Sequence, residues 1–476
     1  MSRKFTMNSV DELASFIDQV AEILLQENLS LFVGAGSSIQ YSLPGWIKLV
    51  EEVVGGADDI VDPIIKAEYG KLKNIDVKSR IANKLLGYNI DSSIRTTYLH
   101  YLLNHKYKSI WTTNYDNVIE RILDNKGVSY KEIATYRDFN HLSNNRLFLY
   151  KMNGSCRNPD SIVIDKDDFL EFEYLHEGFR ILLKRELLCN NMLFVGCSFN
   201  DDILRKCIKD IIRCTSILND ANYNNEHFAI IAESNNQLLE YVVSDLSSKY
   251  NISCLAVSNP KKSFIIAEIL SSKVRSESVF ISGAKSFSSE SQELDAKNFC
   301  RQLSLMLKER RYKVISGMGM SIGNFVVGPI IKRAHEKNEN VDRFISINPF
   351  PFSTYKEHYI HRKSMISMSG ISIFIYGDYR DDYERTGMWS EYLISKEQKN
   401  IIIAIPTSYP SISNTIFANE LTDDKSFCSR HECLLKSFTK NTDIRDSLES
   451  LICQLYAYST KKYEELINQA YYNYNH

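Results

Sequence analysis

Short apolar runs alternate with amphipathic stretches along the whole chain, a pattern that predicts strands separated by helices. Residues 29–33, 109–111 and 191–195 are apolar or β-branched runs, and each is followed at once by small or polar residues. Ser9 and Glu12 have the spacing of a capping box in front of a stretch with helical periodicity. Because strands that alternate with helices favour a parallel sheet, the sequence predicts an α/β fold built from βαβ units.

The same pattern starts again after a polar and charged stretch at residues 271–277, which we interpret as a linker. Further strands with their turns are predicted at residues 278–283, 314–323, 371–376 and 401–405. The sequence therefore predicts two Rossmann-like parallel-sheet domains, residues 1–275 and residues 276–476. A tyrosine-rich helix is predicted at residues 443–474, where it would cap the second domain or form a subunit interface.

Composition limits the classes of partner. The chain has 476 residues, which is too long for a single hydrophobic core and predicts two domains. Its formal net charge of -2 gives no electrostatic basis for nucleic-acid binding. No apolar run approaches the ~18 residues of a membrane helix, and no signal-peptide core follows the first residues. The ten cysteines form no Cys-x-x-Cys pair. We therefore expect a cytoplasmic protein with no metal, no membrane contact and no nucleic-acid partner.

The first glycine turn, Gly34-Ala35-Gly36-Ser37-Ser38, directly follows a predicted strand. Glycine has no Cβ, so the backbone of such a turn can approach a phosphate closely, although tight strand-to-helix turns need glycine in many folds without a ligand. Asn114 follows another predicted strand and would present an amide to the same crevice. Counting a further predicted strand at residues 146–152, four strand ends carry small polar residues, which is more than packing requires. This favours a nucleotide site.

Five motifs arrive in order along this half of the chain: Gly-Ala-Gly-Ser-Ser at 34–38, Leu-Pro-Gly-Trp at 43–46, Thr-Thr-Asn-Tyr-Asp at 112–116, Lys-Met-Asn-Gly-Ser at 151–155 and Phe-Val-Gly-Cys-Ser-Phe at 194–199. Together they resemble the sirtuin-type NAD-binding domain, in the divergent form of bacterial antiphage effectors, over about residues 1–275. The resemblance implies cleavage of the nicotinamide–ribose bond of NAD+, with Asn114 positioning the ribose and the attacking water. The residues expected to bind NAD+ are Gly34, Ala35, Gly36, Ser37, Ser38, Thr113, Asn114, Asp116, Gly154, Gly196, Ser198 and Asp201.

The second catalytic position departs from the family. The resemblance implies a histidine that acts as base on a ribose hydroxyl, and this chain has Asn153 there. An amide cannot take a proton, so general-base help of roughly 10²–10⁴-fold should be missing. Asn153 is either an introduced substitution that leaves NAD+ intact or a natural feature of a weak enzyme in which another group or solvent takes the proton. We favour the first, because the surrounding motif is otherwise complete.

The second half of the chain resembles a SLOG domain, a sensor of nucleotide derivatives, through Phe-Ile-Ser-Gly, Ser-Gly-Met-Gly and Ser390-Glu391. The order of domains resembles the NADase effectors of Thoeris antiphage systems. This implies that a cyclic ADP-ribose isomer, made by a partner TIR-domain protein, switches on NAD+ depletion (abortive infection), and that subunits form tetramers and filaments. The residues expected to bind this activator are Ser282, Gly283, Gly317, Met318, Gly319, Met320, Arg362 and Glu391.

Each of the two charged activator residues has an alternative role. The planar fork of Arg362 suits a pyrophosphate, and Glu391 suits ribose hydroxyls. Arg362 beside Lys363 could also be a solvated pair, and Glu391 a carboxylate that the helix macrodipole favours.

The leading hypothesis is a ligand-gated NAD+ glycohydrolase. The alternative is a non-catalytic nucleotide-binding sensor, which Asn153 favours. A sirtuin-type protein deacylase is disfavoured because the four-cysteine zinc module is missing.

Overall fold

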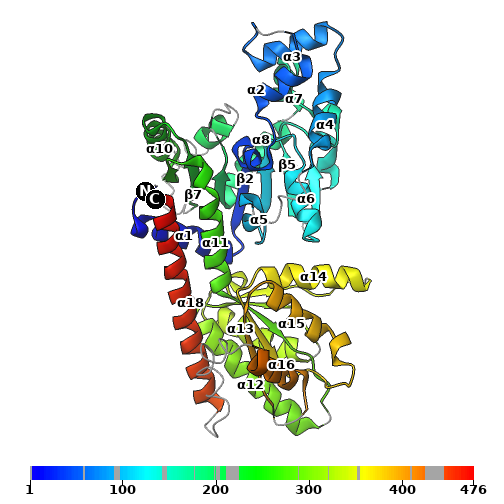
Figure 1. Cartoon of the computed structure of the whole chain (residues 1–476), viewed down its shortest axis with the longest axis vertical. Helices are drawn as coiled ribbons and strands as arrows, with labels where there is room; N and C mark the ends of the chain where they lie inside the picture. Colours follow the sequence, from blue (N-terminus) through cyan, green and yellow to red (C-terminus); the bar gives the residue numbers. More distant parts are fainter. Residues whose placement is uncertain are drawn as a thin grey trace. The chain divides into compact units, whose positions relative to one another are not determined.

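The computed structural model describes residues 3–56, 59–89, 97–141, 147–175, 177–197, 199, 204–210, 225–287, 289–319, 321–350, 354–407, 410–423 and 444–475. The chain divides into two compact units, one of Met1–Glu268 with Tyr471–His476 and one of Ile269–Ala470. Each unit is built on its own parallel sheet (Figure 1). The predicted α/β class with two parallel sheets is confirmed.

The first unit contains an eight-stranded parallel sheet in the order β1-β8-β7-β6-β2-β3-β5-β4. Its strands are β1 (Lys4–Thr6), β2 (Leu29–Val33), β3 (Ser109–Thr112), β4 (Tyr130–Ile133), β5 (Leu147–Lys151), β6 (Asn191–Val195), β7 (His227–Ala232) and β8 (Ile252–Val257). All residues of β2, β3 and β6 are buried, as expected of parallel strands covered on both faces. The order changes direction between β2 and β6, so this is the switch point at which open α/β sheets bind ligands.

Helices cover both faces of this sheet. They are α1 (Val10–Leu25), α2 (Trp46–Val54), α3 (Pro63–Leu72), α4 (Val77–Gly87), α5 (Tyr98–Leu102), α6 (Val118–Asn125), α7 (Lys166–Leu175), α8 (Glu177–Cys189) and α10 (Asn236–Tyr250). On one face α8 and α10 pack against strand residues in a single apolar cluster. On the other, the ring of Phe16 in α1 meets Phe228 with centroids 5.8 Å apart. Helices α2, α3, α4 and α7 gather at one end of the unit (Figure 1).

The second unit contains a five-stranded parallel sheet in the order β11-β10-β9-β12-β13. Its strands are β9 (Ser278–Ser282), β10 (Lys313–Ser316), β11 (Ile345–Ile347), β12 (Ile371–Ile375) and β13 (Ile401–Ile405). The helices are α12 (Glu290–Glu309), α13 (Ile322–Glu336), α14 (Tyr355–Ser367), α15 (Gly387–Glu397), α16 (Ile412–Asp423) and α18 (Ile444–Asn475). Here the order changes direction between β9 and β12, which makes a second switch point.

The predicted C-terminal helix is present, and it caps the second sheet. Leu448, Leu451, Ile452 and Leu455 of α18 join α12 and α13 in the apolar cluster on one sheet face. Helices α14, α15 and α16 supply the clusters on the opposite face. The apolar stripe of α18 is therefore used within this unit.

The prediction of a linker at residues 271–277 is wrong. Most of it is the end of helix α11 (Phe264–Ser276), whose apolar spacing continues through the buried Val274. Arg275 is part of the packing, because its guanidinium donates to the carbonyl of Ser369 at 3.0 Å and to Asn400 Oδ1 at 2.8 Å. The polar composition of this stretch therefore indicated a linker, although its charged residues are part of a packed helix.

No helix among the described residues has the length and apolarity needed to cross a membrane.

Candidate functional site

Two glycine loops meet at the first switch point. The Gly34 N–H donates to the carbonyl of Val195 at 2.8 Å, and the Gly36 N–H donates to the carbonyl of Gly196 at 2.9 Å. A Cβ on Gly34 would lie 2.4 Å from the Gly196 oxygen, and Gly196 itself has φ +64°. These glycines are thus required by the contact between the two loops, before any ligand is considered.

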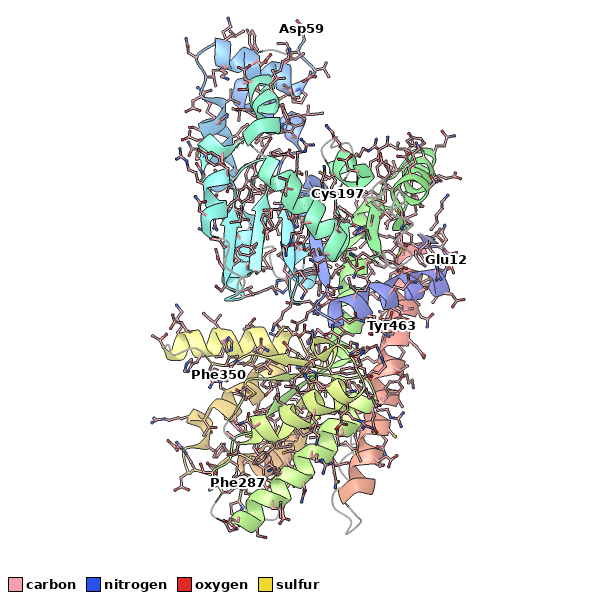
Figure 2. All side chains as sticks on the ribbon, turned by 180° about the vertical axis from the view of Figure 1, so that it is seen from behind. Glu12, Asp59, Cys197, Phe287, Phe350 and Tyr463 are labelled. Carbon is pink, nitrogen blue, oxygen red and sulfur yellow. The ribbon has the colours of Figure 1, made fainter. Side chains whose placement is uncertain are left out.

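A cavity of about 420 Å³ opens beside these loops. This volume lies within the range typical of small-molecule sites. The predicted residues that line it are Gly34, Ala35, Gly36, Ser37, Thr113 and Gly196. Cys197, labelled in Figure 2, also lines it, as do Gln40, Tyr98 and Glu233. The last three were missed, although Glu233 directly follows β7 and could have been found by inspecting every strand end.

Asn114 is buried next to the glycine loop and has one unused acceptor. Its amide Nδ2 donates to the carbonyl of Gly34 at 3.3 Å and to Ser38 Oγ at 3.1 Å. Its Oδ1 is buried and has no hydrogen-bond partner among the described residues. Leaving a buried acceptor unpaired costs roughly 1–3 kcal/mol, so this oxygen is suited to a donor supplied by a ligand.

Two further predicted residues hold Asn114 in place. Ser38 Oγ donates to Asp116 Oδ2 at 2.8 Å, and Asp116 Oδ1 accepts from the Val118 N–H at 3.1 Å. Both side chains are buried and have partners within the chain. A relay from Asp116 through Ser38 therefore fixes the orientation of the Asn114 amide.

Asn153 lies at the neighbouring strand end. Thr112 of β3 pairs with Lys151 of β5, so Asn114 and Asn153 each follow the paired positions by two residues. Asn153 is partly exposed and its carbonyl accepts from the Val163 N–H at 3.0 Å. The turn needs glycine next, because Gly154 has φ +94° and an added Cβ would lie 2.2 Å from the Ser161 oxygen. Neither asparagine is among the described residues that line the cavity.

A buried ion pair supports these two strand ends, and sequence reasoning missed it. Lys151 Nζ donates to Glu120 Oε1 at 2.6 Å and to the backbone carbonyls of Tyr115 and Asp116. Lys151 is fully buried. Burial alone lowers the pKa of Lys151, but the carboxylates of Glu120 and Asp116 outweigh it and raise the pKa above its usual value. The ammonium therefore persists and ties the Asn114 loop to β5.

The second switch point holds a polar cluster made of predicted residues. Ser282, the last residue of β9, donates to Glu391 Oε2 at 2.5 Å, and Arg362 Nε donates to Glu391 Oε1 at 3.2 Å. The Arg362 guanidinium lies 4.8 Å from the ring centroid of Phe350, the residue labelled beside α14 in Figure 2. Burial raises the pKa of Glu391, and the bonds from Ser282 and Arg362 oppose that rise.

The predicted glycines of this unit also pack against one another. A Cβ on Gly319 would lie 2.2 Å from the carbonyl of Gly283, and one on Gly317 would lie 2.8 Å from the Phe350 ring. Met318 has φ +56°, and its N–H donates to Ser316 Oγ at 3.1 Å. The structure thus brings the loops after β9 and β10 together.

Three predicted site residues, Ser198, Asp201 and Met320, lie outside the described residues. Among the described residues no group of three or more His, Cys, Asp or Glu side chains is arranged to hold a metal ion.

Comparison with known proteins finds a family match in each half of the chain. Residues 108–255 match the SIR2-like domain, and residues 265–460 match the Sir2- and TIR-associating SLOG family. The chain is 27% identical over 431 residues to the NAD(+) hydrolase ThsA of Bacillus cereus (strain MSX-D12), covering 84% of this chain and 87% of that protein. It is 28% identical over 421 residues to the NAD(+) hydrolase ThsA of Enterococcus faecium, covering 82% and 86%. It is also 26% identical over 196 residues to defense-associated sirtuin 2 of Bacillus subtilis, covering 39% and 19%.

Fold and matches together define a protein in which a SIR2-like domain precedes a SLOG domain. Two ThsA proteins align with it over most of both chains, so this chain is similar to ThsA over most of its length.

Proposed function

We propose that the first unit is an NAD+ glycohydrolase. The observation that carries this proposal is the unpaired, buried Oδ1 of Asn114 beside the glycine loops of the switch point. The cavity lined by the same loops is large enough for part of an extended dinucleotide. The relatives named NAD(+) hydrolase support the same activity.

In this proposal each part of the site contacts a different part of NAD+. The backbone of the Gly34–Ser37 loop, which lines the cavity, lies beside the pyrophosphate, and Asn114 Oδ1 accepts a hydrogen bond from a ribose hydroxyl or from water. The bond between ribose C1′ and the nicotinamide nitrogen breaks, and nicotinamide leaves with the electron pair. The water oxygen then bonds to C1′ and releases a proton.

Asn153 sets the expected rate. Its amide does not accept that proton at neutral pH, so the proton passes to solvent. The proposed enzyme is therefore slower than the same site with a histidine at this position. Whether Asn153 is natural or introduced does not alter this expectation.

The second unit is proposed to sense a cyclic ADP-ribose isomer, as part of Thoeris antiphage defence that ends in NAD+ depletion and abortive infection. Arg362 would pair with the pyrophosphate and Glu391 with ribose hydroxyls. The signal would be the product of a TIR-domain protein. Gating requires that this ligand bind two arrangements of the protein with different affinity, and self-association into tetramers or filaments would supply them.

Nicotinamide release from NAD+, measured with and without cyclic ADP-ribose isomers, tests the proposal. Release that rises with one isomer is the expected result. Tight NAD+ binding with no release would favour the non-catalytic sensor, which Asn153 makes the second candidate. Release that depends on an acetyl-lysine peptide would favour a deacylase.

A further inference from the structure

A second ion pair lies at the switch point of the second unit, outside the predicted set. Lys285 follows the end of β9 by three residues, and Asp378 follows the end of β12 by three residues. These strands are neighbours, and Phe374 of β12 pairs with Ser282 of β9. Lys285 Nζ lies 2.9 Å from Asp378 Oδ1. The pair therefore occupies the same crevice edge as Ser282.

The surroundings of the Asp378 carboxylate are those of a bound anion. Besides the Lys285 ammonium, the backbone N–H of Ser286 donates to Oδ2 at 3.1 Å and to Oδ1 at 3.3 Å. Burial alone would raise the pKa of Asp378, but these bonds outweigh it and hold the pKa below its usual value. An ammonium and a loop N–H that converge on one anion are also the donors that phosphate groups use.

The loop that carries Asp378 is fixed by its backbone. Tyr376 and Gly377 both have positive φ, 60° and 94°. Their carbonyls accept from the N–H groups of Ser413 at 2.9 Å and Ile412 at 3.2 Å. Asp378 is thereby directed at the β9 loop, while 37% of its side chain is exposed and Lys285 retains 15%. Solvent, and hence a ligand, reaches the pair.

We propose that Lys285 and the Ser286 N–H form a phosphate-binding site, and that Asp378 occupies it until the phosphate of a nucleotide displaces the carboxylate. The inference rests on the proposed sensing function and adds two residues to it. The pyrophosphate of such a nucleotide carries two negative charges against one on the carboxylate, so it competes well for the same donors. Arg362 and Glu391 form a parallel case, a cation paired with a carboxylate of the same chain.

The direction in which one substitution changes anion affinity distinguishes two roles of Asp378: competition with phosphate, or support of the β9 loop. Asp378→Asn keeps the size and one acceptor oxygen but removes the charge. If Asp378 competes with phosphate, this variant binds anions more tightly. If Asp378 only fastens the β9 loop, the variant binds them more weakly, because the loop loses its partner.

Calorimetric titration of the whole protein with inorganic pyrophosphate and with ADP-ribose, at low ionic strength, is the test. Asp378→Asn should bind pyrophosphate about fivefold more tightly, and Lys285→Met about tenfold more weakly. Glu336→Gln is the matched control, since Glu336 pairs with Arg333 within α13 and both are exposed. Thermal unfolding of each variant separates loss of binding from loss of fold, and Lys285→Arg should retain binding.

Three outcomes would overturn the inference: unchanged or weaker pyrophosphate binding by Asp378→Asn, unchanged binding by Lys285→Met, or no binding of pyrophosphate by Asp378→Asn at millimolar concentration. The proposed function stands apart from these. If a cyclic ADP-ribose isomer activates all variants equally, the sensor survives and this site fails. If no isomer activates the wild-type chain, the sensor fails while pyrophosphate still tests the site.

Discussion

The two crevices share one topology and differ in how their polar groups are satisfied. At the first, a buried amide oxygen of Asn114 has no partner among the described residues and a cavity lies beside its loop. At the second, both cations are paired with carboxylates of the same chain, Arg362 with Glu391 and Lys285 with Asp378. An unpaired acceptor can bind a ligand without first losing a partner. Groups with internal partners have to exchange them on binding, and that exchange would provide the two states that the proposed sensor requires.

The largest expected effect is at the departure from the family pattern in the first crevice. Asn153→His should raise nicotinamide release by roughly 10²–10⁴-fold, because imidazole accepts a proton near neutral pH and an amide does not. The rate with activator present is the measurement. Asn153→Gln, which remains an amide, is the control and should not rise. Equal rates for Asn153 and the histidine variant would show that position 153 supplies no base.

The buried pair beneath the first crevice gives the next largest effect. Lys151→Met should cost about 3–5 kcal/mol of the free energy of unfolding, because Glu120 is left buried and unpaired. Denaturant unfolding measures it. Lys363→Met removes an exposed pair with Glu397 and should cost less than about 1 kcal/mol. A similar loss for both would mean that burial does not distinguish the two regions, and Lys151→Met with Glu120→Leu should recover much of the stability.

Removal of the Asn114 side-chain amide tests whether its unpaired oxygen acts in the reaction. Asn114→Ala should lower the rate of nicotinamide release by about 10²–10³-fold, the usual cost of one hydrogen-bonding group that acts on the transition state. Single-turnover rates separate this from weaker NAD+ binding. Asn114→Asp keeps an acceptor but loses the N–H donated to Gly34 and Ser38, and it should also be slow. An unimpaired Asn114→Ala protein would remove Asn114 from the mechanism.

The smallest effect is expected at the second crevice. Arg362→Gln should raise the activator concentration for half-maximal activity about tenfold and leave the rate without activator unchanged. Titration of activity with the cyclic isomer measures it. Lys363→Gln is the neighbouring control. If Arg362→Gln lowers the rate without activator instead, the residue belongs to the fold and not to sensing.

Much of this arrangement is predictable because parallel strands have a strong local signal. Buried runs followed by glycine located β2, β6 and β9, and parallel neighbours made the meeting of strand ends a consequence. The reason for the glycines was only partly foreseen. Gly34 and Gly196 are required by their own contact, which joins loops more than 150 residues apart in the chain.

Charged pairs were the part that sequence reasoning could not supply. Lys151 on a strand reads as a solvated residue, and only the fold places it against Glu120 with no exposed surface. Lys285 and Asp378 are distant in sequence, and no spacing rule links them. The end of helix α11 was taken for a linker because it is polar and charged. In the structure Arg275 of this helix has hydrogen-bond partners inside the unit.

Helices α11 and α18 each cross the division between the two units, since the boundaries fall after Glu268 and after Ala470. Tyr474 of α18 hydrogen-bonds to Ser258 of the first unit at 3.0 Å, while Leu455 of the same helix belongs to the core of the second. Neither unit can melt without unwinding helices that the other also needs. We therefore expect a scanning calorimeter to record one cooperative transition for this chain.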